Sequence, residues 1–221
     1  MTAEQRLDSD DFVPTIRVAD LLGDRSFAHI LVNKMYQARG YSVLPETQNT
    51  NRVTLIAMDH GVTIGTITVG FDGPGGLVVE DIFAKEVRGL RDAGHRVCEF
   101  TKLAIEPEVK SKKVLIALMQ AAFICGREIH GCTTCVIEVN PRHARFYQAM
   151  LGFSLLAGER HNKRVNAPAV LMALDLAFAA EKIENFHQQD STRSDRSLYR
   201  HSLSPQQSSV EAERLTAKVA I

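Results

Sequence analysis

The order of apolar and polar positions predicts helices and strands along most of the chain. Residues 27–38 carry apolar side chains at the three- to four-residue spacing of an amphipathic helix, which Gly40 would end. Residues 52–58 alternate in the manner of a β-strand, and residues 62–71 are rich in strand-forming residues. Because the turn sequence Asp59-His60-Gly61 separates these two runs, they predict a β-hairpin.

The centre of the chain is its most regular part, because it reads strand, helix, strand, helix. The first of these helices, at 114–129, is apolar almost all round and should be buried on most sides, with Ser111 as its N-cap. Two parallel strands joined by such a helix require a right-handed crossover. After a glycine-rich break at 72–76, the predicted elements are a strand at 77–79, a helix at 82–91, a strand at 97–105, the helix at 114–129, a strand at 134–139, a helix at 143–150 ended by Gly152, and strands at 154–156 and 169–174.

Length and composition indicate one folded domain with a tail at each end. The 221 residues, 45% of them apolar, can build a core that is stable without disulfides or metal. Residues 1–14 read as a flexible arm and residues 15–178 as the domain. From 179 to 221 the character changes, because Gln, Ser, Arg and His dominate 187–209 and cannot bury enough apolar surface to fold alone. We expect a mostly disordered tail there, with a short helix at 210–219.

Charge and hydropathy exclude some classes of partner. The 26 basic residues balance the 26 acidic ones, so the chain lacks the broad positive field of nonspecific nucleic-acid binding, and we expect no nucleic-acid partner. No apolar run approaches the ~20 residues of a membrane helix. The polar, acidic N-terminus does not resemble a signal peptide, which predicts a cytoplasmic protein.

The cysteines and histidines do not predict a metal site. Cys132 and Cys135 form one CxxC pair with no second pair, and they fall at the start of the strand expected at 134–139. Positions i and i+3 of a strand point to opposite faces, so packing in a reduced core is the favoured interpretation. The eight histidines show no HExxH or HxxxH spacing.

One motif resembles a known enzyme family. Residues 140–153 read Asn-Pro-Arg-His-Ala-Arg-Phe-Tyr-Gln-Ala-Met-Leu-Gly-Phe. This is similar to the GNAT acyltransferase motif, in which an Asn, a short helix with Phe-Tyr, and Leu-Gly-Phe follow the fifth strand. The resemblance implies an α/β (α+β) fold, with a mixed central sheet flanked by helices.

The chain departs from ordinary GNAT enzymes ahead of its long central helix. Those enzymes carry a glycine-rich turn there, whose backbone N–H groups hold the diphosphate of coenzyme A. Residues 106–115 contain no glycine, and larger side chains hinder the close backbone approach that a diphosphate needs. Lys110, Lys112 and Lys113 lie at the helix start, where the helix dipole disfavours cations by ~0.3–1 kcal/mol each. A bound anion, such as the single phosphate of phosphopantetheine on an acyl carrier protein, would compensate. Solvated surface lysines are the equally weighted alternative.

This combination resembles the N-acyl amino acid synthases and the related acyl-homoserine lactone synthases. Their fourth strand carries Glu-x-x-Arg/Lys, which Glu99 and Lys102 match, and residues 164–172 are similar to the amino acid synthases. Lys rather than Arg at position 102 argues against a lactone product. The resemblance implies transfer of a long-chain fatty acyl group from an acyl carrier protein thioester to the amine of an amino acid. The acyl-phosphopantetheine thioester, on carrier protein or coenzyme A, would be a donor substrate, with no resident cofactor.

Thioester aminolysis needs a base for the amine, and Glu99 is the candidate, either directly or through water. Its apolar neighbours at positions 103 and 105 share its strand parity and predict that Glu99 faces inward. A surface carboxylate paired with Lys102 or Arg96 is the alternative. Because Lys102 lies on the other face of a regular strand, pairing it with Glu99 would require a bulge.

The resemblance to GNAT enzymes assigns the remaining roles. A bulge would aim backbone N–H groups near Leu103, Ala104 and Ile105 at the thioester, and Tyr147 would protonate the departing thiolate. Tyr147 could equally be a packed aromatic residue. Asn140 would hydrogen-bond the pantetheine arm, although an Asx turn that ends the strand is slightly favoured.

Other assignments stay open at this point. Phe83, Phe100, Phe123 and the central helix are candidates for an acyl slot or for plain core. Arg39, Arg52 and Arg164 are candidates for binding a substrate carboxylate. A lipid product would also permit peripheral contact with a membrane. The alternative functions are an acyl-CoA-dependent GNAT N-acetyltransferase and a non-catalytic GNAT-fold protein that binds a carrier protein or a lipid.

Overall fold

The computed structural model describes residues 12–19, 22–41, 51–109, 112–188 and 197–219. They form a seven-stranded sheet in the order β1-β2-β3-β4-β5-β7-β6. Every neighbouring pair is antiparallel except β4 with β5, so the sheet is mixed, as predicted. The strands are β1 (Thr15–Val18), β2 (Arg52–Asp59), β3 (Val62–Phe71), β4 (Val97–Ile105), β5 (Thr134–Val139), β6 (Ser154–Asn162) and β7 (Ala167–Asp175).

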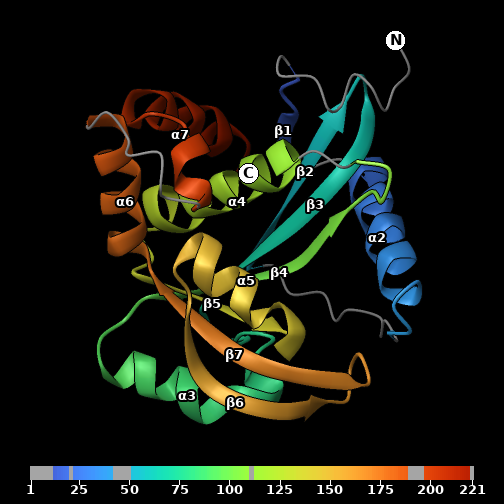
Figure 1. Ribbon diagram of the computed structural model, residues 1–221, viewed down its shortest axis with the longest axis vertical. Helices are drawn as coiled ribbons and strands as arrows, with labels where there is room; N and C mark the ends of the chain where they lie inside the picture. The colour runs from blue at the N-terminus through green and yellow to red at the C-terminus, as the bar shows by residue number, and fades with distance from the viewer. Residues whose placement is uncertain (1–11, 20–21, 42–50, 110–111, 189–196, 220–221) are drawn as a thin grey trace.

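Helices cover both faces of this sheet (Figure 1). One face, called the α2/α3 face below, packs against α2 (Leu22–Gln37) and α3 (Glu80–Asp92). The other, called the α4 face, packs against α4 (Lys112–Phe123) and the π-helical turn η1 (Ile124–Ile129) that continues it. Four further elements lie on the α4 face, namely α5 (Pro141–Leu151), α6 (Leu176–Gln188), the 3₁₀ turn η2 (Leu198–His201) and α7 (Pro205–Val219).

The main core lies between the sheet and α4. As its apolar sequence predicted, α4 is enclosed on most sides, and Leu118 on α4 and Ile124 on η1 are fully buried. Gly65 on β3 lets α4 approach closely, because a Cβ there would meet Leu118 and Val114 at 3.0 Å. The hairpin of β2 and β3 is confirmed, with Gly61 at a φ of 84° in its turn.

Several predicted elements differ from the structure in their bounds, among them α2, which begins at Leu22 rather than at residue 27. Residues 77–79 form the turn that leads into α3 rather than a strand, because their backbone N–H groups bind side-chain carboxylates instead of a neighbouring strand. The last two strands are longer than predicted, since β6 and β7 pair with each other along their length. The N-cap predicted at Ser111 lies outside the described residues.

The C-terminal part differs most from its expectation. Where a mostly disordered tail was predicted from 179 onward, α6, η2 and α7 pack against the domain and bury Ile183, Leu198, Tyr199 and Leu215. Arg214 Nη2 donates to the Ile16 carbonyl at 2.7 Å, which joins α7 to β1. A few well-spaced apolar residues are therefore enough to dock a polar segment onto an existing core. At the other end, Phe12 is also buried.

The cysteines occupy the core, as predicted. Cys132 and Cys135 are buried, with 7% and 0% exposure. Within the described ranges no group of three or more His, Cys, Asp or Glu side chains could hold a metal ion. No helix in the same part of the chain is long and apolar enough to cross a membrane.

Candidate active site

The sheet opens between its two parallel strands. β4 and β5 are paired only at Val97–Thr134, Cys98–Cys135 and Glu99–Val136. Farther along, β4 continues to pair with β3 on its other side, and β5 with β7. Over the described residues, the edges of β4 and β5 that face each other beyond Glu99 form no further ladder. A cleft between strands of this kind leaves backbone groups available to an inserted ligand.

A β-bulge lies on the β4 side of this opening. Between the pairs Thr66–Ala104 and Thr68–Thr101, β4 has two residues where β3 has one. Lys102, one of the two, has a φ of 52°, in the left-handed region. An extra residue reverses the alternation of side chains. Leu103 therefore joins the core on the α4 face, whereas Ala104 contacts α2.

The bulge confirms one prediction and overturns another. It was expected from the resemblance to GNAT enzymes, and it redirects the backbone at Leu103–Ile105, where the donors to the thioester were predicted. The prediction that Glu99, Leu103 and Ile105 point to the same face of the sheet was wrong, because the bulge moves Leu103 and Ile105 to the opposite face. Val78, Val79 and Arg52 make the contacts that hold Glu99.

Glu99 is a buried carboxylate held from three directions. Its side chain has 0% exposure, and it accepts hydrogen bonds from the backbone N–H groups of Val78 at 3.0 Å and Val79 at 3.1 Å. Arg52 Nη2 lies 3.6 Å from Oε1. Burial raises the pKa of Glu99, while the two N–H groups and Arg52 oppose that rise. A carboxylate whose pKa is raised is a stronger base than an ordinary one, which suits a general base.

Gly70 makes room for this carboxylate. It lies opposite Glu99 in the ladder between β3 and β4. A Cβ at position 70 would lie 2.7 Å from Glu99 Oε1 and 2.8 Å from its Cγ. Because real Cβ atoms do not approach so closely, any side chain at this position would displace Glu99.

A second acid, half-buried, lies on the same face, on β5. Glu138 accepts hydrogen bonds from Asn162 Nδ2 and from Arg164 Nη2, the latter at 2.8 Å. Arg164 Nε also lies 3.0 Å from Asp81 Oδ2. Burial raises the pKa of Glu138, and Arg164 opposes this. Arg164 also acts on the pKa of Glu99, so these charged groups form one cluster beside the opening.

Sequence reasoning named Arg52 and Arg164 but missed Glu138. Its signal is an acidic residue in the otherwise apolar run of residues 134–139, two positions from Val136 and so on the same face. Its contact with Arg164, which lies in the turn between β6 and β7, is distant in sequence and leaves no local pattern that could predict it.

Tyr147 on α5 lies against aromatic rings near the opening. Its ring makes edge contacts with Phe146 and Phe153, at centroid distances of 5.5 and 5.9 Å. Burial raises the pKa of Tyr147 to about 12, and nearby Tyr36 on α2 adds to the rise. The phenol therefore stays protonated at neutral pH, as a proton donor must. Tyr36, which sequence reasoning missed, also has a raised pKa because of burial.

Asn140 serves as a helix cap in this structure. Its Oδ1 accepts the backbone N–H of Arg142 at 3.2 Å, and Pro141 occupies the first helical position of α5. Its Nδ2 donates to the Tyr41 hydroxyl at 3.2 Å. The favoured alternative, a local turn at the end of the strand, is therefore present, and contact with pantetheine stays a prediction.

Basic residues gather at the start of α4. Lys112 and Lys113 begin the helix, and Arg200 and His201 of η2 lie close enough for their charges to interact. Burial and then these three cations lower the pKa of His201. Lys110 lies outside the described residues. The predicted lysines thus share their surface with one cation from the C-terminal segment, Arg200, which sequence reasoning did not place there.

An apolar pocket with a cavity volume of about 40 Å³ lies on the α4 face, and Phe100 at the start of the opening lines it. Phe100, Phe123 and α4 line it and also belong to the main core, so their role as an acyl slot stays a prediction. Phe83 does not, because it packs in a separate core under α3, where the Arg160 guanidinium lies 4.8 Å from its ring centre. Its other walls come from the end of α5, from Leu174 on β7 and from the C-terminal segment.

Solved structures share this architecture. A putative N-acetyltransferase from Lactobacillus plantarum matches with a TM-score of 0.56 and 16% identity, over 75% of this chain and 99% of its own. The acyl-homoserine lactone synthase LasI matches with a TM-score of 0.53 and 15% identity, over 74% of this chain and 90% of its own. These likenesses show the GNAT fold. A match to a family model then gives the class, because it makes the chain an N-acyltransferase.

Within that class, the family model "N-acyl amino acid synthase FeeM" matches residues 28–175, and the chain belongs to this family. The structure of FeeM, an N-acyl amino acid synthase from uncultured soil microbes, matches with a TM-score of 0.69 and 26% identity. The match covers 74% of this chain and 92% of FeeM. No curated protein sequence matches the chain.

Proposed function

We propose that this N-acyltransferase moves a long-chain fatty acyl group from an acyl carrier protein thioester to the amine of an amino acid. One observation carries the proposal. The opening between β4 and β5 has an apolar pocket on the α4 face and a cluster of buried charges on the α2/α3 face. An acyl chain and a charged amino acid can therefore approach the same backbone gap from opposite sides.

Each step of aminolysis has a candidate group. Glu99 takes a proton from the attacking amine, directly or through water, as the nitrogen bonds to the thioester carbon. Backbone N–H groups at Leu103–Ile105 receive the negative charge that develops on the carbonyl oxygen. The carbon–sulfur bond then breaks, and Tyr147 gives its proton to the pantetheine thiolate. The products are an N-acyl amino acid and the free thiol of the carrier.

The charges beside Glu99 support an amino acid as acceptor. Arg52 and Arg164 both act on Glu99 electrostatically and can receive a carboxylate, while Glu138 favours an ammonium group. A plain alkyl amine would leave both guanidinium groups without that partner.

The basic surface at the start of α4 supports a carrier protein as donor. Lys112, Lys113 and Arg200 carry positive charge that would attract a phosphopantetheine phosphate and an acidic carrier. The glycine-free turn ahead of α4 supports the same donor, since it lacks the residues that let a diphosphate approach the backbone. The four free cysteines suit the reducing cytoplasm, where such carriers work.

The experiment for the reaction mixes purified protein, acyl carrier protein loaded with a long-chain acyl group, and single amino acids. Mass spectrometry should find a new acyl amide with at least one amino acid. Absence of any acyl amide across all the amino acids and several simple amines, with a folded protein, would refute the proposal.

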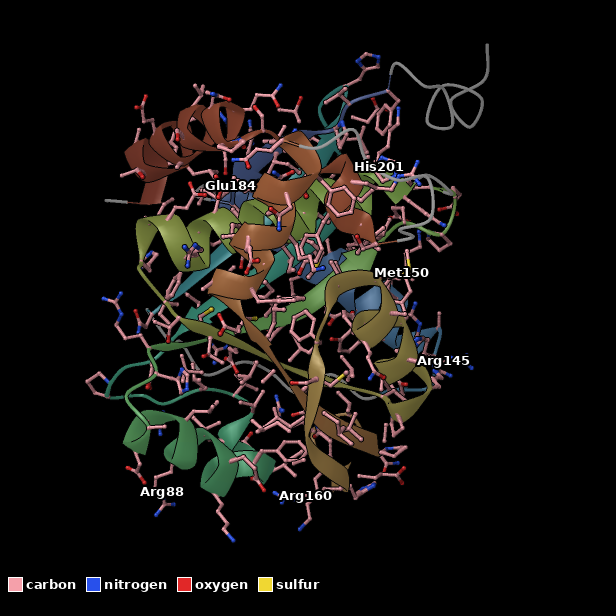
Figure 2. The ribbon with its side chains drawn as sticks, turned by 60° about the vertical axis from the view of Figure 1, so that its left-hand side comes forward. Arg88, Arg145, Met150, Arg160, Glu184 and His201 are labelled. Carbon is pink, nitrogen blue, oxygen red and sulfur yellow. The ribbon has the colours of Figure 1, made fainter. Side chains whose placement is uncertain are left out.

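The experiment for the donor reverses charge. Lys112→Glu combined with Arg200→Glu should lower kcat/KM with the acyl carrier protein at least tenfold, because it reverses charges that steer docking. Turnover of the matching acyl-CoA should change less. Arg88→Glu is the matched control, since exposed Arg88 on α3 lies at the far end of the molecule from His201 (Figure 2). Equal losses with both donors would count against carrier docking at this surface.

A further inference from the structure

The outer wall of the apolar pocket is built by the C-terminal segment. Ala179 and Ile183 of α6 and Leu198, Tyr199 and Ser202 at η2 face Phe100 and α4 across the pocket. All five follow residue 175, where the match to the FeeM family model ends. This wall therefore lies outside the segment that the family model matches.

The pocket begins close to the reacting groups. Leu151, which lines it, follows Tyr147 by four residues on α5, so the two side chains share a helix face about 6 Å apart. Phe100, on the opposite wall, directly precedes the bulged stretch of β4. An acyl chain attached at the opening thus reaches the pocket within a few carbon atoms.

Specific hydrogen bonds hold the wall in place. The buried Tyr199 hydroxyl donates to the Leu151 carbonyl at 2.6 Å. The Leu203 backbone N–H donates to Gln120 Oε1 on α4 at 3.0 Å. A polar contact of 3.0 Å links the His187 ring on α6 to the Ser202 carbonyl. The wall is therefore attached to both helices that flank the pocket, α4 and α5.

We propose that α6 and η2 set the longest acyl chain that this enzyme transfers. The inference rests on the proposed function and extends it to chain length. Side chains packed at crystal-like density yield little to an extra methylene group, so a chain that meets this wall is selected against. One methylene group in an apolar pocket changes selectivity by roughly 10- to 200-fold.

The test changes the pocket in both directions. Leu198→Ala enlarges it and should shift the product profile to longer chains. Ala179→Val fills it, because Ala179 is fully buried in its wall, and should shift the profile to shorter chains. In each case the ratio of kcat/KM between adjacent even chain lengths should change at least tenfold. Val210→Ala, an exposed truncation on α7, is the control and should leave the profile unchanged.

A second readout does not depend on turnover. Octanoate, decanoate, laurate, myristate and palmitate should each stabilise the protein against heat, by an amount that rises with the logarithm of their affinity. The wild type should show rising stabilisation up to one chain length and less beyond it, and that maximum should move in opposite directions in the two variants. This separates the two proposals, since a failed transfer reaction would leave the dependence on fatty-acid length intact.

An unchanged length profile in both folded variants would overturn the inference while leaving the proposed function in place. If Leu198→Ala does not fold, Ile183→Val decides in its stead, because it removes a single methylene group from the same wall. A shift to longer chains with Ile183→Val supports the inference, and no shift refutes it.

Discussion

The two faces of the sheet at its opening differ sharply. On the α2/α3 face, a charged cluster lies beside the opening between β4 and β5. Its members are Glu99, Arg52, Glu138 and Arg164. On the α4 face, the same opening meets an apolar pocket. The difference teaches that one layer of backbone can separate a charged surface from an apolar one. Under the proposed function, the two substrates would meet where that layer is split.

The largest expected effect tests the charged face. Glu99→Gln should lower kcat by about 10²–10⁴-fold, or about 2.7–5.4 kcal/mol, because the amine loses its base. Wild-type kcat/KM should fall as pH drops through the pKa of Glu99, which burial raises above the ordinary 4.5, since only the carboxylate accepts a proton. That acid limb should be absent in the variant. A variant with wild-type rates would remove Glu99 from the mechanism.

The next effect tests Tyr147, the proposed proton donor on α5. Tyr147→Phe should lower kcat by about 10²-fold with an acyl-pantetheine donor, because the thiolate leaves unprotonated. An aryl thioester has a better leaving group that needs no proton, so the same variant should lose little with that donor. Equal losses with both donors would show that Tyr147 acts through its packing against Phe153 instead.

A smaller effect tests how the charged cluster is held. Arg164→Ala removes a charged partner of half-buried Glu138 and should destabilise the fold by about 1.5–3 kcal/mol, measured by urea unfolding at neutral pH. Glu138 already has a pKa raised by burial, and the variant raises it further. The loss should thus shrink in mild acid, where Glu138 is protonated, and reach its full size above that pKa. Exposed Lys163→Ala should stay within about 0.5 kcal/mol.

The smallest effect tests the apolar face. Tyr199→Phe deletes the buried hydrogen bond to the Leu151 carbonyl and should cost about 0.5–1.5 kcal/mol of folding free energy. Ser209→Ala, which deletes an exposed hydrogen bond in α7, is the comparison and should change stability by less than about 0.5 kcal/mol. Indistinguishable unfolding midpoints for the two variants would show that the wall is not anchored through Tyr199.

The order of strands and helices in the domain could be predicted from the sequence, because alternation and helical periodicity report directly on burial. The burial of Glu99 was predicted as well. The face of the sheet to which Leu103 and Ile105 point was predicted wrongly. The bulge at Lys102 depends on pairing with β3 and has no residue pattern of its own. Phe83 was open between acyl slot and core, and it lies in a core, because an aromatic residue signals burial without showing which face of the sheet it joins.

The C-terminal segment was the largest difference. A window average over residues 187–209 is polar, and it hides Leu198 and Tyr199, two adjacent residues that dock on a core formed by distant parts of the chain. Composition predicts whether a segment folds alone. It does not predict whether the segment folds onto something already built.

The hydrogen bond from Arg214 to the Ile16 carbonyl also bears on how the protein is made. It joins residues 198 positions apart in sequence, so this contact forms only after nearly all of the described chain has left the ribosome. Until then the sheet can assemble while one apolar side of α4 is exposed to water. Exposed apolar surface favours aggregation or capture by a chaperone. Chains whose translation stalls after β7 should therefore aggregate. Chains that include α7 should not, because α7 covers the exposed apolar surface.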